Sequence, residues 1–561
     1  MEKFKSFSLS SPPLIFLSFL FLSSLSPISP SGGRRHYNES LFDATLLPNT
    51  STYDFIIVGG GTAGCPLAAT LSQHFKVLVL ESGRNNQDYP QTATEDGFLQ
   101  ILADASSGVA NSPAQSFTSL DGVSNIRGRV LGGGSSVNGG FYSRAQPAFF
   151  EAGAAAGIVW DMGLVNASYE WVEKKVVHRP KLDIWQTAVG GALLEANVRP
   201  FNGFSVEHLE GTKISGTTFG PDGRRHSAAE LLGYAKLTNL VVALRATVEK
   251  ILLDIHPGGL KKPFAKGVMY RDSLGRPHYA FLRPQGEVIL SAGALGSPHL
   301  LLLSGIGPPN LLRPWHIPLA VSHPFVGQFL ADNPQTGVTI ISPFRLPTYL
   351  SKLVGISNSS SFYIETSTKN TPLHPQISAA SPILNHTIAS LFEKVACPVS
   401  TGSLWLASAD VQDNPVVKFN YFASPVDMGQ CIEGMRTMAK VLKSPKLEGF
   451  KFPGVFGGKE FRYVGPEMVR DEEDDLQLEG LCRKSLTTFW HYHGGCLVGK
   501  VVDSEYRVIG VDSLRVVDGS TFAVSPGTNP QATVMMLGRY VGSQLTKEKW
   551  TPNRFAAGKK R

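Results

Sequence analysis

The sequence predicts an α/β fold with two regions, one built on a strand–turn–helix–strand unit and the other largely antiparallel. Three observations support this prediction. The stretch 53–81 holds two buried-strand patterns with a glycine-rich turn and a helix between them. A second apolar strand runs into a turn and an apolar helix over 286–307. From Pro334 to about Cys482 the chain changes to short alternating segments rich in serine and proline, which are typical of an antiparallel sheet.

The stretch 53–81 has the organisation of a dinucleotide-binding unit. Ile56 to Val58 is an apolar run that leads into Gly59-Gly-Gly-Thr-Ala-Gly64, which fits G-x-G-x-x-G. The first glycine permits the tight turn, the second lets the backbone approach a pyrophosphate, and the third lets the helix pack on the strand. Free N–H groups at the helix start favour an anion. Glu81 ends the second strand, where its carboxylate can accept both ribose hydroxyls. The stretch therefore predicts a Rossmann-like site for an adenosine diphosphate moiety and leaves NAD and FAD open.

The first 30 residues predict a secretory signal. Lys3 and Lys5 precede the apolar run 14–22, and serines and prolines follow. The run is too short to span a bilayer comfortably and no later stretch reaches about 20 apolar residues, so a cleaved signal is favoured over a membrane anchor. We expect a secreted, extracellular or vacuolar monomer with no stable membrane span. Sequons agree with secretion and predict glycosylation at Asn38, Asn49, Asn166, Asn358 and Asn385.

Length, charge and cysteine content set further limits. The 561 residues exceed what one core usually supports, so two or more regions are expected. The net charge of +7 is modest and no basic stripe is interleaved with aromatic residues, so no nucleic-acid partner is predicted. The five cysteines are too few for a disulfide scaffold, and at most two bridges can form. We expect Cys65, in the helix after the glycine turn, and Cys496, beside a histidine pair, to stay reduced.

Three further stretches carry weaker signals. Gly128 to Gly140 is glycine-rich, and its backbone N–H groups near 132–138 could serve a pyrophosphate or a flavin edge, with a plain loop as an equal alternative. The alternating runs 240–252 and 265–284 predict a small sheet beside the nucleotide unit. The acidic run 470–475 is most simply a solvated loop.

Two motifs stand near the end of the chain. Trp490-His-Tyr-His-Gly-Gly-Cys496 has two histidines, and Pro526-Gly-Thr-Asn-Pro-Gln-Ala532 opens a predicted helix through 535–545. The first cluster is isolated, so no metal site is predicted. Gly494 to Lys500 fits a phosphate-loop pattern, but Val501 stands where Mg²⁺ needs a hydroxyl, so that function is not predicted. The chain has no G-x-S-x-G, which argues against a serine hydrolase.

Together these motifs resemble the glucose–methanol–choline (GMC) family of FAD oxidoreductases. The resemblance spans 50–548 and is carried by 53–81, Gly132–Gly140, Gly293–Pro298, Leu303–Pro308, Val326–Pro334 and the carboxy-terminal histidine and asparagine motifs. It implies FAD rather than NAD. Trp160–Asn166, Tyr169–Glu173 and Trp490–Cys496 resemble the plant branch that holds the (R)-mandelonitrile lyases and the HOTHEAD proteins, so the extracellular location expected is the cell wall.

The resemblance implies a Rossmann-like FAD-binding domain interleaved with a discontinuous antiparallel-sheet substrate domain. We expect these boundaries: signal peptide 1–30, FAD-binding 50–150, substrate or cap region 151–235, FAD-binding 236–333, substrate-binding 334–484, and FAD-binding with the catalytic residues 485–548. In the lyases, cysteines at the positions of Cys431 and Cys482 are bridged, so this pair is the expected disulfide.

The resemblance also assigns site residues. His491 takes the family's catalytic histidine, and Asn529 takes a second position that holds histidine or asparagine. Phe489 and Trp490 are the expected substrate-binding residues. Some relatives link FAD through a histidine near Asn138, so non-covalent FAD is expected here. The expected FAD contacts are Gly59, Gly61, Thr62, Ala63, Gly64, Glu81, Ser82, Val130, Ser135, Asn138, Gly139, Gly140, Phe141, Val248, Trp490, Asp518, Gly519, Asn529 and Pro530.

The implied chemistry is oxidation of an alcohol. Neutral His491 can take the hydroxyl proton while hydride leaves carbon for the flavin, and the Asn529 amide can stabilise the developing alkoxide. The aromatic Phe489 and Trp490 suggest an aromatic or long aliphatic alcohol. The alternative is cyanohydrin cleavage with structural FAD. It is less favoured because the lyases carry a second histidine where this chain has Asn529 and a tyrosine where it has Phe489. A catalytically dead scaffold is disfavoured because His491 and Asn529 are both present.

Overall fold

The computed structural model describes residues 37–109, 111–255, 262–372, 385–454 and 457–549. The predicted signal over 1–30 lies outside these residues. The described residues contain two large sheets, each with its own hydrophobic core. This arrangement confirms the predicted fold class. The domain boundaries given above stay a prediction.

The first sheet is mainly parallel and contains the nucleotide unit. Its strand order is β1-β10-β3-β2-β13-β12-β11, with β27 also paired to β13. Only the β13–β12 and β12–β11 pairings are antiparallel in this sheet. The strands are β1 (Leu41–Asp43), β2 (Thr50–Val58), β3 (Val77–Glu81), β10 (Leu240–Leu244), β11 (Thr247–Asp254), β12 (Phe264–Arg271), β13 (Pro277–Leu290) and β27 (Leu514–Val516).

The sequence predicts a separate small sheet for the runs 240–252 and 265–284, and this prediction is wrong. β10 pairs in parallel with β3, and β11, β12 and β13 extend the same sheet on the other side of β2. The reason is that β13 pairs with β12 on one side, antiparallel, and with β2 on the other, parallel. The β12–β13 hairpin therefore continues the nucleotide sheet. The predicted strand and helix of 286–307 are the end of β13 and α6 (Gly293–Leu303).

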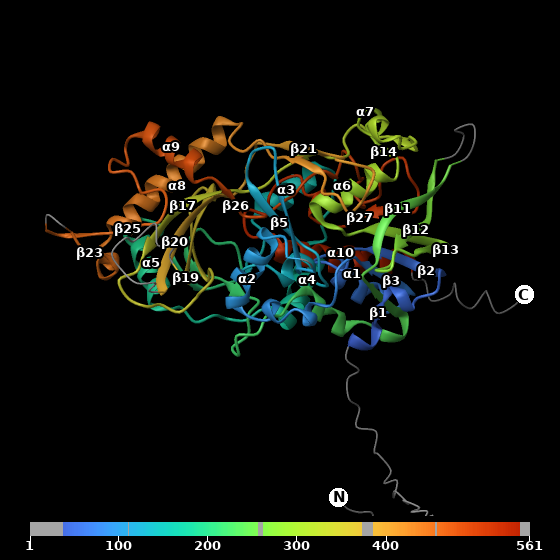
Figure 1. Cartoon of the computed structure of the whole chain (residues 1–561), viewed down its shortest axis with the longest axis horizontal. Helices are drawn as coiled ribbons and strands as arrows, with labels where there is room; N and C mark the ends of the chain where they lie inside the picture. The colour runs from blue at the N-terminus through green and yellow to red at the C-terminus, as the bar shows by residue number, and fades with distance from the viewer. Residues whose placement is uncertain (1–36, 110, 256–261, 373–384, 455–456, 550–561) are drawn as a thin grey trace, which may run out of the picture. The chain divides into compact units, whose positions relative to one another are not determined.

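Helices cover the nucleotide sheet (Figure 1). α1 (Gly64–Leu71) follows β2 directly and packs against α10 (Gln531–Lys549), which also contacts α4 (Met162–Val176). Gly59 has a φ of +105° at the turn, and a Cβ on Gly64 would lie 1.9 Å from the Gly59 carbonyl oxygen. Both positions therefore require glycine, one for its conformation and the other for the close approach of helix and strand.

The second sheet is antiparallel except for one pairing. Its order is β25-β17-β20-β19-β18-β8-β7, with β26 paired to β17, and only β7 and β8 run in parallel. The strands are β7 (Phe201–Phe204), β8 (Gly211–Ile214), β17 (Pro334–Ile341), β18 (Leu353–Ile356), β19 (Phe362–Pro372), β20 (Asn385–Val395), β25 (Arg462–Tyr463) and β26 (Thr487–Thr488).

One face of this sheet packs on helices (Figure 1). α8 (Pro425–Lys443) contacts β20 and β19, α5 (Ile184–Glu195) contacts β18, and α9 (Asp475–Ser485) contacts β17. Glu393 of β20 approaches Gly434 of α8 so closely that a Cβ there would lie 2.3 Å from the Glu393 Cγ. Side chains alternate along a strand, so the neighbouring Lys394 and Phe392 point to the opposite face.

Residues 470–474 of the acidic run form a loop, and Asp475 is the first residue of α9. Asp474 caps α9 by accepting hydrogen bonds from the Leu476 and Gln477 N–H groups. Glu472 pairs with Lys443, and Asp475 pairs with Arg436, both in α8. These ion pairs therefore join the start of α9 to α8.

Further described helices and strands lie between and beside the two sheets. They are α2 (Glu95–Ser106), α3 (Pro147–Ala155), α7 (Pro309–Leu312), β4 (Ala114–Thr118), β5 (Ser124–Gly128), β6 (Phe141–Tyr142), β9 (Gly216–Thr217), β14 (Ile306–Gly307), β15 (Val321–Ser322), β16 (Gln328–Leu330), β21 (Gly402–Trp405), β22 (Val416–Lys418), β23 (Phe452–Pro453) and β24 (Lys459–Glu460). No helix within the described ranges is long and apolar enough to cross a membrane.

A disulfide joins α8 to α9 between Cys431 and Cys482, the pair that the resemblance implied. Cys65, Cys397 and Cys496 are free. The bridge closes a loop with a sequence separation of 51 residues, for which the chain-entropy model gives about 4 kcal/mol of stabilisation.

We therefore expect the double substitution Cys431→Ser and Cys482→Ser to lower the free energy of unfolding by about 2–4 kcal/mol. Urea denaturation of the oxidised protein measures this loss. Cys397→Ser, at a free and half-buried cysteine, is the matched control and should cost much less. Equal stability of the double variant and the wild type would mean that the bridge contributes nothing to the folded state.

Candidate active site

A cavity of about 830 Å³ lies against both sheets and contains the carboxy-terminal motifs. It is lined by all of the expected FAD-contacting residues except Gly64 and Val130. Gly64 lies behind the turn, where it lets α1 approach β2. Val130 is buried in a small apolar cluster with Ile101 and Ala105 of α2. The expected substrate-binding residues Phe489 and Trp490, and both expected catalytic residues, line the same cavity.

Glu81 is fixed at one end of the cavity by backbone donors. Its two carboxylate oxygens accept hydrogen bonds from the Gly60 N–H at 2.9 Å and the Gly83 N–H at 2.8 Å. Burial raises the pKa of Glu81, and these two N–H groups oppose that shift. Each oxygen keeps lone pairs for a further donor. The carboxylate is therefore held ready for two hydroxyl groups, as the ribose of a dinucleotide would offer.

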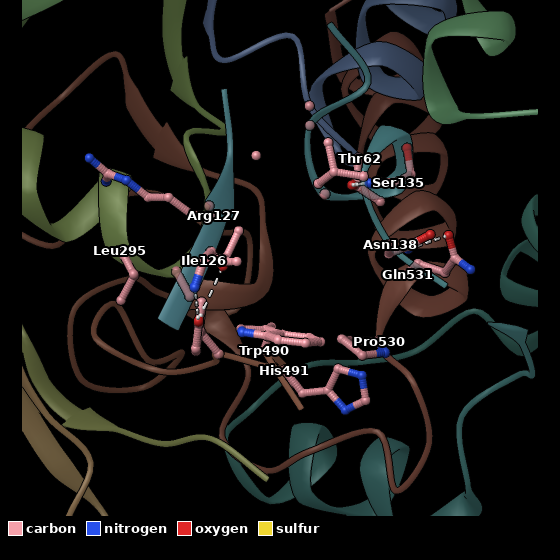
Figure 2. Close-up of a pocket in the computed structure, with 18 of the residues that line it drawn as sticks. Thr62, Ile126, Arg127, Ser135, Asn138, Leu295, Trp490, His491, Pro530 and Gln531 are labelled. Atoms are coloured by element: carbon pink, nitrogen blue, oxygen red, sulfur yellow. Dashed lines mark hydrogen bonds between the residues drawn. The ribbon is translucent and has the colours of Figure 1, made fainter. Parts of the chain in front are cut away.

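Two glycine-rich segments meet next to Glu81. A Cβ on Gly133 would lie 2.8 Å from the Gly61 Cα, so the two backbones touch where a side chain would keep them apart. The Thr62 hydroxyl accepts a hydrogen bond from the Ser135 N–H at 3.3 Å, a contact drawn in Figure 2. Backbone N–H groups of glycine turns at the start of a helix suit a pyrophosphate. The residues present therefore fit the adenosine diphosphate part of FAD.

Asn138 is held in one orientation. Its Oδ1 accepts hydrogen bonds from Arg225 Nη1 and from the Gly140 N–H, both at 3.0 Å. Its Nδ2 donates to Gln531 Oε1 at 2.9 Å, as Figure 2 shows, and Gln531 Nε2 in turn donates to the Phe141 carbonyl at 2.6 Å. An amide is not a nucleophile, and here both the oxygen and the nitrogen of the Asn138 amide are also engaged in hydrogen bonds. The sequence had not identified Arg225 or Gln531 in this network.

His491 lines the cavity, and its imidazole ring makes no hydrogen bond within the described ranges. Its backbone N–H donates to Asp332 Oδ1 at 2.7 Å, and its ring stacks on Phe489 with centroids 5.1 Å apart. Nδ1 is buried and has no hydrogen-bond partner within the described part of the chain. Burial, and then the charge of Lys394, lowers the pKa of His491 well below its ordinary value. The imidazole is therefore neutral at pH 7 and can accept a proton.

The residues around His491 fix its direction. Trp490 has a positive φ of 57°, and its N–H donates to Thr488 Oγ1 at 2.7 Å. Asp332 accepts from the Thr488 and Tyr421 hydroxyls as well as from the His491 N–H. Asp332 lies in the stretch Val326–Pro334, one of those that carry the family resemblance, and its place there could have identified it. It acts as a positioning residue, because its carboxylate holds the backbone of His491 rather than its ring.

Lys394 is the main residue that the sequence did not reveal. Its side chain is fully buried, and Nζ donates to Asn529 Oδ1 at 3.3 Å. The ammonium also lies over the Tyr363 ring at 4.3 Å and the Phe489 ring at 5.5 Å. Burial lowers the pKa of Lys394 to about 8, against the attraction of Glu365. Because the Asn529 oxygen accepts from Lys394, the Asn529 amide nitrogen is left to donate into the cavity.

His493 does not line the cavity. Its Nδ1 lies 3.0 Å from the His491 carbonyl oxygen, and burial lowers its pKa to about 4. Cys496 is buried and free. Throughout the described ranges, no cluster of three or more histidine, cysteine or acidic residues could hold a metal ion.

The predicted glycosylation sites fall mainly on the surface. Asn38, Asn49, Asn166 and Asn358 are exposed. Asn385 begins β20, and its side chain lies outside the described part of the structure. The exposure of the first four is compatible with modification.

Comparison with known proteins identifies relatives along most of the chain. Residues 53–335 and 398–538 match the two models of the family described as GMC oxidoreductase. The chain is 49% identical to an (R)-mandelonitrile lyase-like protein of Arabidopsis thaliana, over 96% of this chain and 98% of that protein. It is 46% identical to (R)-mandelonitrile lyase 1 of Prunus serotina, over 91% of this chain and 90% of that protein. It is 45% identical to sinalpyl alcohol oxidase Nec3 of Nesocodon mauritianus, over 96% of each.

Solved structures show the same fold at lower identity. Formate oxidase of Aspergillus oryzae is similar with a TM-score of 0.73 and 20% identity, over 90% of this chain and 99% of that one. A fungal aryl-alcohol oxidase is similar with a TM-score of 0.67 and 22% identity, over 90% of this chain and 100% of that one.

Proposed function

We propose that this chain, which belongs to the GMC oxidoreductase family, uses non-covalently bound FAD to oxidise an aromatic or long-chain alcohol to the aldehyde. The observation that carries the proposal is the neutral, buried His491, which lines the same cavity as the oriented amide of Asn529 and whose ring has no hydrogen-bond partner among the described residues. FAD, when bound, supplies the acceptor for the hydride that leaves the alcohol carbon.

His491 takes the hydroxyl proton in this proposal. Burial lowers the pKa of its imidazole, so the ring is neutral at pH 7 and one of its nitrogens can accept a proton. Its stacking on Phe489 and the backbone hydrogen bond to Asp332 hold it in place without occupying either ring nitrogen. The proton of the substrate hydroxyl therefore moves to an imidazole nitrogen that has no competing partner in the described protein.

Asn529 and Lys394 stabilise the negative charge that forms on the substrate oxygen. The amide nitrogen of Asn529 can donate to that oxygen because its Oδ1 is engaged by Lys394. The ammonium of Lys394 adds a positive charge in a water-poor site, where charge stabilisation is strong. Phe489 and Trp490 provide apolar walls for an aromatic or aliphatic substrate.

Steady-state oxidation tests the proposal. The purified yellow protein is supplied with benzyl alcohol, cinnamyl alcohol or a long-chain primary alcohol, with O₂ or a dye as electron acceptor, and the aldehyde is measured. Aldehyde formation that depends on the acceptor is the expected result. A folded, FAD-loaded protein that oxidises none of these alcohols with either acceptor would contradict the proposal.

The second candidate is cleavage of a cyanohydrin such as (R)-mandelonitrile, and Lys394 is the observation that favours it. Departing cyanide needs a nearby cation or proton donor, and Asn529 alone is a poor one. The buried ammonium of Lys394, bonded to Asn529, provides that cation. Benzaldehyde release from (R)-mandelonitrile without consumption of an electron acceptor would support this candidate. We rank it second because the chain has Asn529 and Phe489 where the lyases have histidine and tyrosine.

We also propose that the chain is secreted to the cell wall or vacuole as a glycosylated monomer. The support is the signal-like segment 1–30 and the exposed sequons at Asn38, Asn49, Asn166 and Asn358. Peptide N-glycosidase treatment of the protein purified from its native tissue, followed by mass spectrometry, tests both the cleavage near residue 30 and the glycans.

The glycine turn offers a test of FAD binding that is separate from folding. A Cβ on Gly61 would lie 3.8 Å from its nearest neighbours, so the chain itself has room for alanine there. Gly61 lines the cavity where the pyrophosphate approaches, and overpacking costs about 1–3 kcal/mol. We expect Gly61→Ala to weaken FAD binding by roughly 10- to 100-fold while the apoprotein melts at an unchanged temperature.

Gly429→Ala is the matched control, because Gly429 lies in α8 with no atom within 4 Å of an added Cβ. This variant should bind FAD like the wild type. Unchanged FAD affinity in Gly61→Ala would mean that the pyrophosphate does not approach this turn.

A further inference from the structure

One wall of the cavity is the face of the antiparallel sheet that points away from α8. Three rows of paired residues cross this wall. The row nearest His491 contains Phe392, whose ring lies 6.5 Å from that of Phe489, paired with Glu365. The next row pairs Ser390 with Thr339 on one side and Ser367 on the other. The last row pairs Ile388 with Lys369. The cavity is lined by Glu365, Ser367, Lys369, Ile388, Ser390 and Phe392.

The middle row is polar, unlike the aromatic Phe489 and Trp490 that predicted an aromatic or long aliphatic alcohol. The Thr339 and Ser390 hydroxyls lie 2.9 Å apart, and Ser367 lies beside them in register. Phe392 and Phe489 therefore give aromatic character to the wall near His491, and the next row adds hydroxyl groups. A substrate that extends along this wall passes from aromatic side chains to hydroxyl groups.

Lys369 lies at the far end of the wall and has no counterion among the described residues. Its side chain is half-buried and lines the cavity, and no ion pair or side-chain hydrogen bond joins it to another residue in the described ranges. Burial alone lowers the pKa of Lys369, with no contribution from a neighbouring charge. The adjoining segment 373–384 contains no aspartate or glutamate. By contrast, Lys394, which lies near His491, is attracted by the negative charge of Glu365.

The spacing along the strand gives the length of the site. Lys369 is four residues beyond Glu365 on β19, which corresponds to about 13 Å at the usual rise of a strand. The lysine side chain can reach back over part of this distance. The gap therefore suits a molecule with one aromatic ring and a short arm between its two polar ends.

We propose that Lys369 binds a carboxylate at the end of the substrate remote from the oxidised carbon. The substrate class is then an aromatic alcohol that carries its CH–OH group at one end and a carboxylate at the other, with the Thr339, Ser390 and Ser367 hydroxyls beside its middle. This inference rests on the proposed alcohol oxidation, because it names the substrate class of the same cavity.

The test compares 4-(hydroxymethyl)cinnamate with its methyl ester, which has nearly the same shape but no charge. The wild-type holoenzyme is expected to prefer the acid in kcat/KM, and Lys369→Gln is expected to reduce the acid-to-ester ratio by roughly 10- to 100-fold, mainly through KM of the acid. Lys266→Gln is the control for net charge, because Lys266 is exposed on β12 of the other sheet. That control should keep the wild-type ratio. A wild-type preference for the ester, or a ratio that Lys369→Gln leaves unchanged, would overturn the inference.

A binding measurement separates this inference from the proposed function. Calorimetry with 4-methylcinnamate, which has the carboxylate but no hydroxyl to oxidise, is carried out on the wild type and on Lys369→Gln. Weaker binding to the variant supports the carboxylate site even if no alcohol is oxidised. Equal binding to both proteins overturns it, whatever the activity towards benzyl alcohol.

Discussion

His491→Ala should lower kcat for alcohol oxidation by about 10²- to 10⁴-fold, the usual contribution of a positioned general base. The physical reason is that the neutral imidazole of His491 lines the cavity with no hydrogen-bond partner among the described residues, so its removal leaves the hydroxyl proton without an acceptor. The holoprotein should remain folded and yellow, because His491 holds neither the nucleotide turn nor Glu81. Stopped-flow reduction of the flavin measures the loss directly.

His74→Ala is the control for this substitution, since His74 is exposed and does not line the cavity. It should reduce the flavin at the wild-type rate. Loss of FAD from His491→Ala would contradict the account, because it would make the residue structural rather than catalytic. The wild-type pH profile gives a second check. The pKa of His491 is lowered, so kcat/KM should not fall as the pH decreases through about 6.5, the ordinary histidine value.

Lys394→Met should lower kcat/KM by roughly 10²-fold, in the range found when one oxyanion donor is removed. The substitution keeps an apolar stem of similar length but removes the cation that fixes the Asn529 amide. A lysine is charged below its pKa, and the pKa of Lys394 is lowered to about 8. Wild-type activity should therefore fall as the pH rises through about 8, and the variant should lack this alkaline decline.

Lys213→Met provides a matched control for burial. Lys213 is also fully buried, but it lies in β8, does not line the cavity, and donates to Ser143 and to backbone carbonyls. This variant should lose stability yet keep the turnover and the alkaline decline of the wild type. An alkaline decline that persists unchanged in Lys394→Met would contradict the role given to Lys394, and this result does not depend on whether Lys213→Met folds.

The sequence predicted the parts of the site whose signals are local. The unit 53–81 carries its strand, turn, helix and acid within one short stretch, and the structure places Glu81 and the glycines around one end of the cavity. The carboxy-terminal motifs likewise bring His491 and Asn529 to the same cavity. Each of these features depends on neighbours in the chain, so a pattern of residues was enough to identify it.

Features that depend on distant pairing were missed. In sequence, Lys394 reads as a surface residue at the end of an alternating strand, yet β19 and β17 flank β20 and bury its side chain against Tyr363. The run 240–252 was predicted to belong to a separate sheet because nothing in it shows that β10 pairs with β3, which is far away in the chain. The polar wall with Lys369 arises in the same way, from strands that meet only in the folded protein.

A single anaerobic turnover with benzyl alcohol and with α,α-dideuterobenzyl alcohol distinguishes oxidation by FAD from cyanohydrin cleavage. We expect the visible absorbance of the oxidised flavin to be lost as benzaldehyde forms, and deuterium to slow this loss because the C–H bond breaks in the same step. Flavin that stays oxidised with the alcohols, while (R)-mandelonitrile yields benzaldehyde under the same conditions, would contradict the account and identify the chain as a lyase.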